Sequence, residues 1–312
     1  MSTFLWFIPV FISSAQQVPD TNFTLTIRQP AYQKDSGPLV LIDQAHHNMH
    51  TKNGGFLAFS RLLEQDGYRV RSLQAAVNDL EVLNGCKILV IANALDSSNL
   101  GNWVLPTPSA FSKEEISMIR SWVKNGGSLF LIADHMPFAG AASKLGKAFG
   151  FEFINGFAFT GERTWPPSEF SVEDETLPTS PVVTGIRDYE KTDKVVTFTG
   201  SAFYTPDMST PVLSFLEEHR SLQPDTAWRF NAKTRWQDLK GFHQGAILKY
   251  GKGKIAVFGE AAMFTAQIVN GNVPVGFNSD VAPQNAQFTL NVIHWLDEVK
   301  EYHGKAVTNP AK

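Results

Sequence analysis

Three short segments of consecutive apolar residues constrain the fold of this 312-residue chain more than any other feature. They are Leu39–Ile42, Ile88–Ala92 and Leu129–Ala133, and polar residues follow each of them directly. A strand that is covered on both faces is apolar at successive positions, whereas a strand with one solvated face alternates. The three segments therefore predict strands in the interior of a parallel sheet.

Helical patterns lie between the predicted strands. Apolar residues recur at helical spacing over 56–63, and Ser112 and Glu115 have the spacing of a capping box at the start of a second helix. Strands that alternate with helices in this way predict an α/β fold. We expect an open, mostly parallel sheet with helices on both faces, of the flavodoxin-like class.

The remaining segments divide the chain. Residues 1–15 contain an apolar run and end at Ser13-Ser14-Ala15, which predicts a signal peptide and a periplasmic or secreted protein. A packed or disordered apolar N-terminus is the alternative. We predict a linker or N-terminal extension over 16–36, the α/β domain over 37–300 and a polar tail over 301–312. Seven prolines between about 152 and 240 predict a β-rich or irregular insertion within that domain.

Composition excludes several classes of partner. No segment has the ~20 consecutive apolar residues of a membrane-spanning helix, so we expect no transmembrane segment. The net charge is −3, and the lysines and arginines form no dense cluster, which argues against nucleic acid as a partner. Cys86 is the single cysteine, so an intrachain disulfide cannot form, and we expect a small buried side chain there. The oligomeric state stays open.

Polar, titratable residues gather where the predicted strands end. Asp43, His46 and His47 follow the first strand, Asp134 and His135 follow a central strand, and Glu260 follows a late one that pairs as a hairpin. In an open parallel sheet, ligands bind at the carboxyl ends of the strands. We therefore expect these side chains to share one edge of the sheet.

These residue types support several kinds of chemistry. Imidazoles and carboxylates bind divalent metals such as Zn²⁺, and a bound metal can acidify a water for hydrolysis. Without a metal, the same groups can act as an acid–base pair or bind a small, glycan-like ligand. We assign catalysis to Asp134, His135 and Glu260, ligand binding to Asp43, His47, Arg163 and Trp165, and metal binding to His46, Asp134 and His135.

Each assignment has a structural alternative. His46 and His47 can be loop residues that bond to the backbone, and Asp43 can hold the same loop by hydrogen bonds. Asp134 can cap a helix that begins at Pro137, and Glu260 can do the same for the segment that follows it. Arg163 and Trp165 lie in the predicted insertion, where they form either a lid over the site or an exposed packing pair.

The order of the segments resembles the class I glutamine-amidotransferase-like fold, in particular uncharacterised bacterial domains of the DUF4350 type and the ThuA-like group. The matching segments are Val40–Asp43, Leu62–Tyr68, Ile88–Ala92, Trp122–Leu129, Gly251–Gly259 and Phe288–Leu296. The resemblance implies a cysteine nucleophile on a turn after a strand. Cys86 precedes a strand instead, and Asp134 and His135 stand where the nucleophile would be.

Cysteine-dependent glutaminase chemistry is therefore not expected. Two hypotheses follow. The first is an exported hydrolase-like enzyme that acts on a small or carbohydrate-derived substrate through its Asp/His/Glu cluster, with or without a divalent metal. The second is a non-catalytic ligand-binding or envelope interaction module on the same fold.

Overall fold

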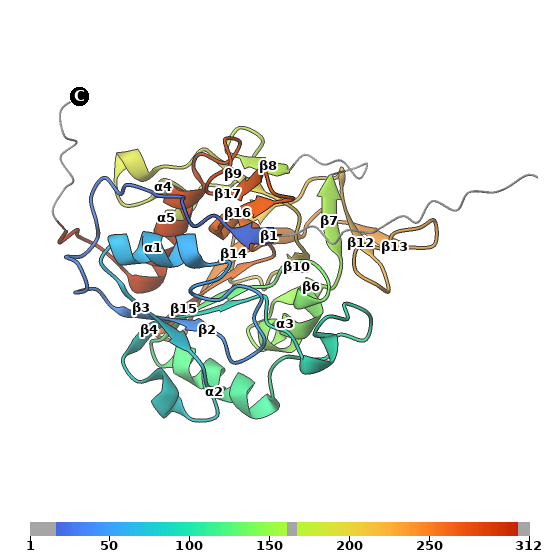
Figure 1. Ribbon diagram of the computed structural model, residues 1–312, viewed down its shortest axis with the longest axis horizontal. Helices are drawn as coiled ribbons and strands as arrows, with labels where there is room; N and C mark the ends of the chain where they lie inside the picture. The colour runs from blue at the N-terminus through green and yellow to red at the C-terminus, as the bar shows by residue number, and fades with distance from the viewer. Residues whose placement is uncertain (1–16, 161–166, 305–312) are drawn as a thin grey trace, which may run out of the picture.

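A mixed β-sheet forms the centre of the computed structural model, which describes residues 17–160 and 167–304 (Figure 1). Within those residues the sheet has nine strands in the order β3-β2-β4-β5-β15-β14-β10-β6, with β11 also paired to β14. The strands are β2 Leu39–Asp43, β3 Arg69–Leu73, β4 Cys86–Ala92, β5 Ser128–Ile132, β6 Glu152–Ile154, β10 Ala202–Tyr204, β11 Thr210–Ser214, β14 His243–Tyr250 and β15 Gly253–Phe258. The pairings among β3, β2, β4, β5 and β15 are parallel, and those from β15 to β6 are antiparallel.

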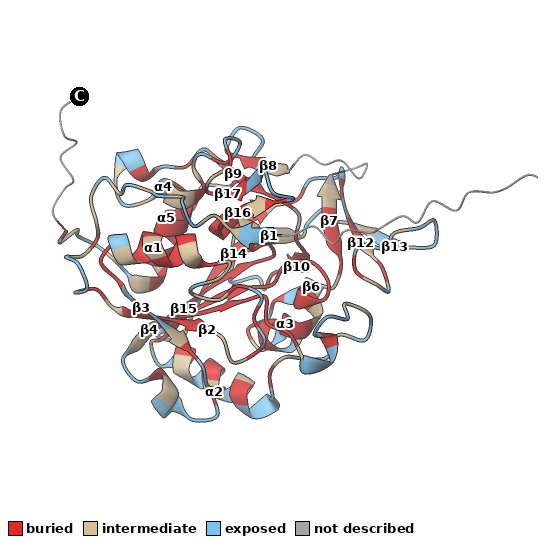
Figure 2. Ribbon diagram, viewed as in Figure 1, coloured by how far each residue is buried: buried red, intermediate tan, exposed pale blue. Residues whose placement is uncertain are grey.

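Helices cover both faces of the parallel strands. The helices are α1 Leu57–Gln65, α2 Lys113–Lys124, α3 Phe138–Lys147, α4 Pro181–Thr184 and α5 Asn285–Asp297. Val40 and Ile42 pack in the same apolar cluster as α1 and α5, whereas Leu39 and Leu41 pack in the cluster that includes α2 and α3. Successive residues of a strand point to opposite faces, so two covered faces require apolar residues at every position. Figure 2 accordingly shows the central strands as buried along their length.

The capping box expected at the second helix is present. The Ser112 hydroxyl accepts a hydrogen bond from the Glu115 N–H at 3.1 Å, and the Glu115 carboxylate accepts one from the Ser112 N–H at 2.9 Å. The helix ends before Gly126, whose φ of 122° few other residues adopt. Local sequence therefore sets both ends of α2.

The predicted insertion is interwoven with the main sheet. Its strands β6, β10 and β11 extend the antiparallel half, and three others, β7 Phe157–Thr160, β12 His219–Gln223 and β13 Arg235–Asp238, make a separate antiparallel sheet. Figure 1 shows β12 and β13 projecting to one side of the molecule. Smaller sheets pair β8 Ser168–Ser171 with β9 Lys194–Thr197, and β1 Gln17–Pro19 with β16 Ala266–Val269 and β17 Val273–Gly276.

A buried polar network ties the C-terminal helix to distant segments. Nε2 of His294 lies 2.6 Å from the Asp66 carboxylate, which also accepts a hydrogen bond from the Ala31 N–H at 2.7 Å. On the other side of the imidazole, Nδ1 lies 3.1 Å from the Tyr302 hydroxyl, which donates to Glu190. None of the helices in the described part of the chain is long and apolar enough to cross a bilayer.

Candidate functional site

The carboxyl edge of the parallel strands is held together by Asn93, the residue directly after β4. Its side-chain oxygen accepts a hydrogen bond from the Asp134 N–H at 2.9 Å, and its carbonyl accepts one from the Met49 N–H at 3.0 Å. The backbone of Asn93 has a φ of 50°, a conformation that Asn tolerates better than most residues. Asn93 therefore links the loops after β2, β4 and β5, a role that sequence reasoning did not assign.

Asp134 and Glu260 lie at neighbouring strand ends, after β5 and β15. The Asp134 carboxylate accepts hydrogen bonds from the N–H groups of His135 at 2.7 Å and Ala261 at 3.4 Å. Burial raises the pKa of Glu260 well above its ordinary value, and the nearby charge of Asp134 raises it further. The two catalytic candidates on these strands thus interact electrostatically.

Both acids also serve as backbone acceptors. The Glu260 oxygens accept hydrogen bonds from the N–H groups of Ala262 at 2.8 Å and Met263 at 2.7 Å. This side chain therefore caps a short turn, which is the structural role considered for it from the sequence. The helix cap proposed for Asp134 is wrong, because α3 begins after Pro137 without a side-chain hydrogen bond. The Asp134 side chain instead turns back to its own neighbour, His135.

His50 is a buried imidazole whose pKa is influenced by burial and by the charge of Asp134. Its ring stacks on Phe56, with centroids 5.2 Å apart, and its Nδ1 has no hydrogen-bond partner among the described residues. Burial lowers the pKa of His50 to about 4, although the charge of Asp134 opposes this. A Cβ added to Gly55 would lie 2.1 Å from Nδ1, so the glycine makes room for this ring.

His135 lies within a group of aromatic side chains. Its ring stacks on Phe157 at a centroid distance of 4.4 Å and an angle of 13°, and Trp228 meets it edge-on at 4.8 Å. Trp103 and Phe138 lie 6.0 and 5.8 Å away. We call these five residues, His135, Phe157, Trp228, Trp103 and Phe138, the His135 aromatic cluster.

The bond from Nδ1 of His135 to the Met136 carbonyl, at 2.6 Å, fixes the tautomer. Because a carbonyl can only accept, Nδ1 carries the proton, and Nε2 of the neutral ring is then an acceptor. This leaves one hydrogen-bonding position on an imidazole that is otherwise surrounded by apolar rings.

Two loops hold the tryptophans beside this imidazole. The Trp103 carbonyl accepts a hydrogen bond from the Ala227 N–H at 2.8 Å, and the Leu105 N–H donates to the Asp225 carbonyl at 2.9 Å. Trp228 has a φ of 64°, a strained conformation for a bulky residue, and its side chain remains 49% exposed. Strain of this kind persists only where surrounding contacts impose it, and it is common at ligand sites.

His46 lies between two carboxylates at a different part of the edge. Its Nδ1 lies 2.8 Å from Asp43 and its Nε2 lies 2.9 Å from Glu115, and all three residues are buried. Burial alone would lower the pKa of His46, but the hydrogen bonds to Asp43 and then Glu115 outweigh it and raise the pKa. Asp43 also accepts a hydrogen bond from the Ala45 N–H at 3.2 Å. It therefore holds the loop after β2, which is the structural role considered for it from the sequence.

The predicted metal set of His46, Asp134 and His135 is not assembled. Among the residues that the structure describes, no three His, Cys, Asp or Glu side chains are placed to hold a metal ion. The loop after β2 directs His46 toward the start of α2, and the bond to Met136 directs His135 into the aromatic cluster. His47 is exposed with a φ of 49°, and Arg163 and Trp165 fall outside the described residues.

Cys86, the first residue of β4, is not activated. Its thiol donates a hydrogen bond to the Ile88 carbonyl at 3.2 Å. Burial raises the pKa of the thiol to about 12, so the thiolate is scarce near neutral pH. The side chain is half-buried at the start of the strand rather than on a turn after one.

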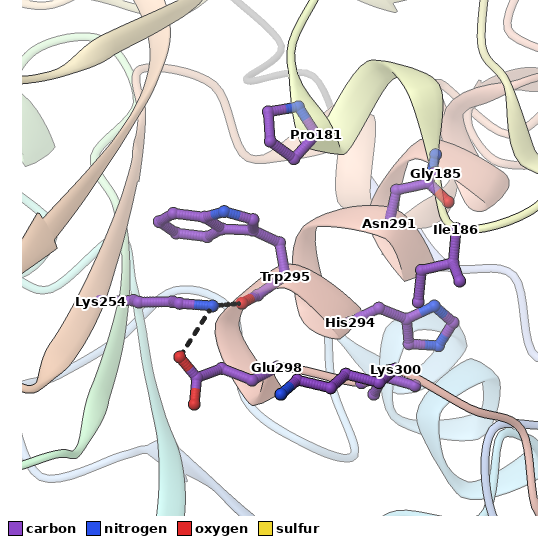
Figure 3. Close-up of a pocket in the computed structure, with 10 residues that line it drawn as sticks. Pro181, Gly185, Ile186, Lys254, Asn291, His294, Trp295, Glu298 and Lys300 are labelled. Carbon is purple, nitrogen blue, oxygen red and sulfur yellow. Dashed lines mark hydrogen bonds and ion pairs between the residues drawn. The ribbon is translucent and has the colours of Figure 1, made fainter.

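A pocket of about 310 Å³ lies at the opposite edge of the sheet, where β15 begins (Figure 3). The Lys254 ammonium projects toward it but donates to the Trp295 carbonyl at 2.6 Å and pairs with Glu298 at 3.3 Å. Its cation is thus already engaged by the chain. The strand-end residues Asp134 and Glu260 take no part in this pocket.

Comparisons with known proteins find structures of similar fold but no matching family. No family model matches the chain, and no curated protein matches it. The mmIFT52 N-terminal domain is similar at a TM-score of 0.55 and 15% identity, over 83% of this chain and 96% of that one. At this identity the likeness concerns the fold alone.

Two bacterial structures are similar at lower scores. A ThuA-like protein from Bacteroides uniformis has a TM-score of 0.45 and 12% identity, over 88% of this chain and 94% of its own. A cytoplasmic protein from Salmonella typhimurium has a TM-score of 0.48 and 15% identity, over 83% and 99%. A ThuA-like protein is therefore among the structural neighbours, but its TM-score is too low to support an inference about function.

Proposed function

We propose that the His135 aromatic cluster binds a small, uncharged, ring-shaped ligand such as a sugar unit. The observation that carries this proposal is an imidazole with one acceptor nitrogen among aromatic rings, beside the half-exposed Trp228. A sugar ring has a face of C–H bonds, which packs on aromatic rings, and a rim of hydroxyl groups, which donate hydrogen bonds. Ligand sites commonly combine mostly apolar walls with a few placed polar groups.

Titration calorimetry with a panel of neutral mono- and disaccharides tests this proposal. We expect His135→Ala to abolish the binding that the native chain shows. Tyr204→Ala should leave it unchanged, because Tyr204 is an exposed aromatic residue on β10, outside the cluster. Far-UV circular dichroism of both variants checks that they fold. The absence of binding to every saccharide in the panel would refute the proposal.

Hydrolysis is the second candidate function, and the raised pKa of Glu260 beside Asp134 favours it. Two interacting acids whose environments differ can divide the roles of proton donor and proton acceptor. The hydrogen bonds that Glu260 accepts from Ala262 and Met263 occupy both of its oxygens, which is why binding ranks first. Release of reducing sugar from oligosaccharides, lost in Asp134→Asn with binding retained, would establish turnover.

We also propose membership of the ThuA-like group and export from the cell. The five parallel strands run 2-1-3-4-5 in chain order, which is the flavodoxin-like order. The signal peptide proposed for residues 1–15 lies outside the described residues. Mass spectrometry of the mature protein from a bacterial host tests export, and an intact Met1 would contradict it.

A further inference from the structure

We infer that the ligand is an uncharged oligosaccharide whose further sugar units lie along the sheet of β7, β12 and β13. This inference rests on the function proposed for the His135 aromatic cluster and extends it to a substrate class. Its central residue is Trp236, on the outermost strand β13, which no sequence pattern marked as functional.

The register of this sheet puts Trp236 on the same face as the cluster. Phe157 on β7 lies opposite Leu222 on β12, and Leu222 lies opposite Trp236 on β13. Directly opposed residues of antiparallel strands point to the same face. Because neighbouring strands are about 4.8 Å apart, the backbone of Trp236 lies roughly 10 Å from that of Phe157. Trp236 is thus two strands away from the cluster on the same face of this sheet.

Two further aromatic side chains lie beside Phe157. Phe159 is two residues after Phe157 and therefore on the same face, with its ring parallel to that of Phe157 at a centroid distance of 6.3 Å. Phe230 packs edge-on against both rings, at 5.2 and 5.9 Å. Phe159 and Phe230 are only partly buried. Phe157, Phe159 and Phe230 therefore form a continuous group of aromatic rings next to His135.

Trp236 is exposed to solvent, and its indole ring is in contact with Arg220. Its side chain is 53% exposed, and the guanidinium of Arg220 lies 4.4 Å from its ring centre. Arg220 also pairs with Asp238 across the strands at 3.4 Å. The cation fixes the indole, and the neighbouring guanidinium and carboxylate offer hydrogen bonds to hydroxyl groups.

The charge of the hairpin favours an uncharged ligand. Residues 217–240 contain five basic and four acidic side chains, which leaves a net charge of +1. Arg220 is balanced by Asp238, and Lys240 pairs with Glu217. A surface that binds phosphates or nucleic acid has a clear excess of positive charge. We therefore favour a neutral oligosaccharide over an acidic polymer.

The test is the dependence of affinity on ligand length. A series of neutral oligosaccharides of one to six units, built from the sugar that binds best, is titrated into the full chain. We expect native affinity to increase with length. Trp236→Ala should weaken binding of the longer ligands about 3- to 10-fold and leave the single sugar unaffected. Trp236→Phe should restore part of the gain, and Tyr204→Ala is the matched exposed control.

The outcomes separate this inference from the proposed function. If a single sugar binds through His135 but Trp236→Ala has the native affinity for every length, the inference fails and the proposed function stands. If proline-rich peptides or acidic oligosaccharides bind the hairpin better than neutral ones, the inference also fails. If no saccharide binds at all, both fail. Equal melting temperatures of the native chain and Trp236→Ala show that the loss is local.

Discussion

The buried arrangement of His46 between Asp43 and Glu115 predicts a pH-dependent cost for Glu115→Gln. Nε2 of His46 lies 2.9 Å from Glu115, with both side chains almost fully buried. A hydrogen bond to a charged group contributes about 1.5–3 kcal/mol. The glutamine can still accept the Ser112 N–H but cannot balance a charged imidazole. We expect the free energy of unfolding at pH 6 to fall by about 2 kcal/mol.

The direction of the pH dependence follows from the pKa of His46, which burial would lower but Asp43 and Glu115 raise. The stabilisation by its protonated form is complete below the unfolded value of about 6.5 and is lost as the pH rises through the folded value. For Glu115, burial alone would raise the pKa, but the hydrogen bonds from the Ser112 N–H and His46 outweigh it and lower the pKa. Its contribution is present above its ordinary value and is lost as the pH falls. The cost of Glu115→Gln should therefore be largest near pH 5–6.5.

Urea unfolding, followed by far-UV circular dichroism at pH 6 and pH 9, measures this dependence. We expect the cost to be smaller at pH 9, because the protonated fraction of His46 decreases as the pH rises. Ser112→Ala is the matched control, because it removes a capping bond of about 1 kcal/mol without changing the charge. Its cost should be the same at both pH values. If Glu115→Gln lowers the free energy of unfolding equally at pH 6 and pH 9, Glu115 does not stabilise a protonated His46 and the prediction is refuted.

Two further predictions concern buried contacts. Gly55→Ala should lower the free energy of unfolding by about 1–3 kcal/mol, because the new Cβ would lie 2.1 Å from Nδ1 of His50; an unchanged urea midpoint would mean that the ring moves aside. Asp66→Ala should cost about 3–5 kcal/mol in the same assay, because His294 and the Ala31 N–H lose their shared acceptor. A cost below 1 kcal/mol would show that water replaces the carboxylate.

The central strands and α2 could be predicted from the sequence because their signals are local. β2 and β5 are buried at every residue, and each is apolar except at one end, where β2 has Asp43 and β5 has Ser128. The capping box of α2 is also complete within four residues. Edge strands are harder, as β11 illustrates. Pro211 lies within it opposite Ala246, next to an irregular register, and a proline argues against a strand in sequence alone.

The partners of the site residues could not be predicted, because loops bring them from far along the chain. Glu115 is 69 residues from His46, and its capping-box spacing explained it without any second role. Trp228 reaches His135 through the contact between Ala227 and Trp103. For the same reason, the three residues assigned to a metal, His46, Asp134 and His135, are not brought together. Strand ends share an edge, but the path of each loop decides which way His46 and His135 point.

The polar groups at this edge differ in what they leave available to a ligand. Asp43 and Glu115 use their charge on His46, and Glu260 uses both oxygens on backbone N–H groups. Nε2 of His135 is different, because the Met136 carbonyl takes up only Nδ1. A ligand that donates a hydrogen bond from a hydroxyl and offers an apolar face satisfies both the nitrogen and the rings around it. This match of groups is the reason to test sugars first and to seek turnover only where binding is found.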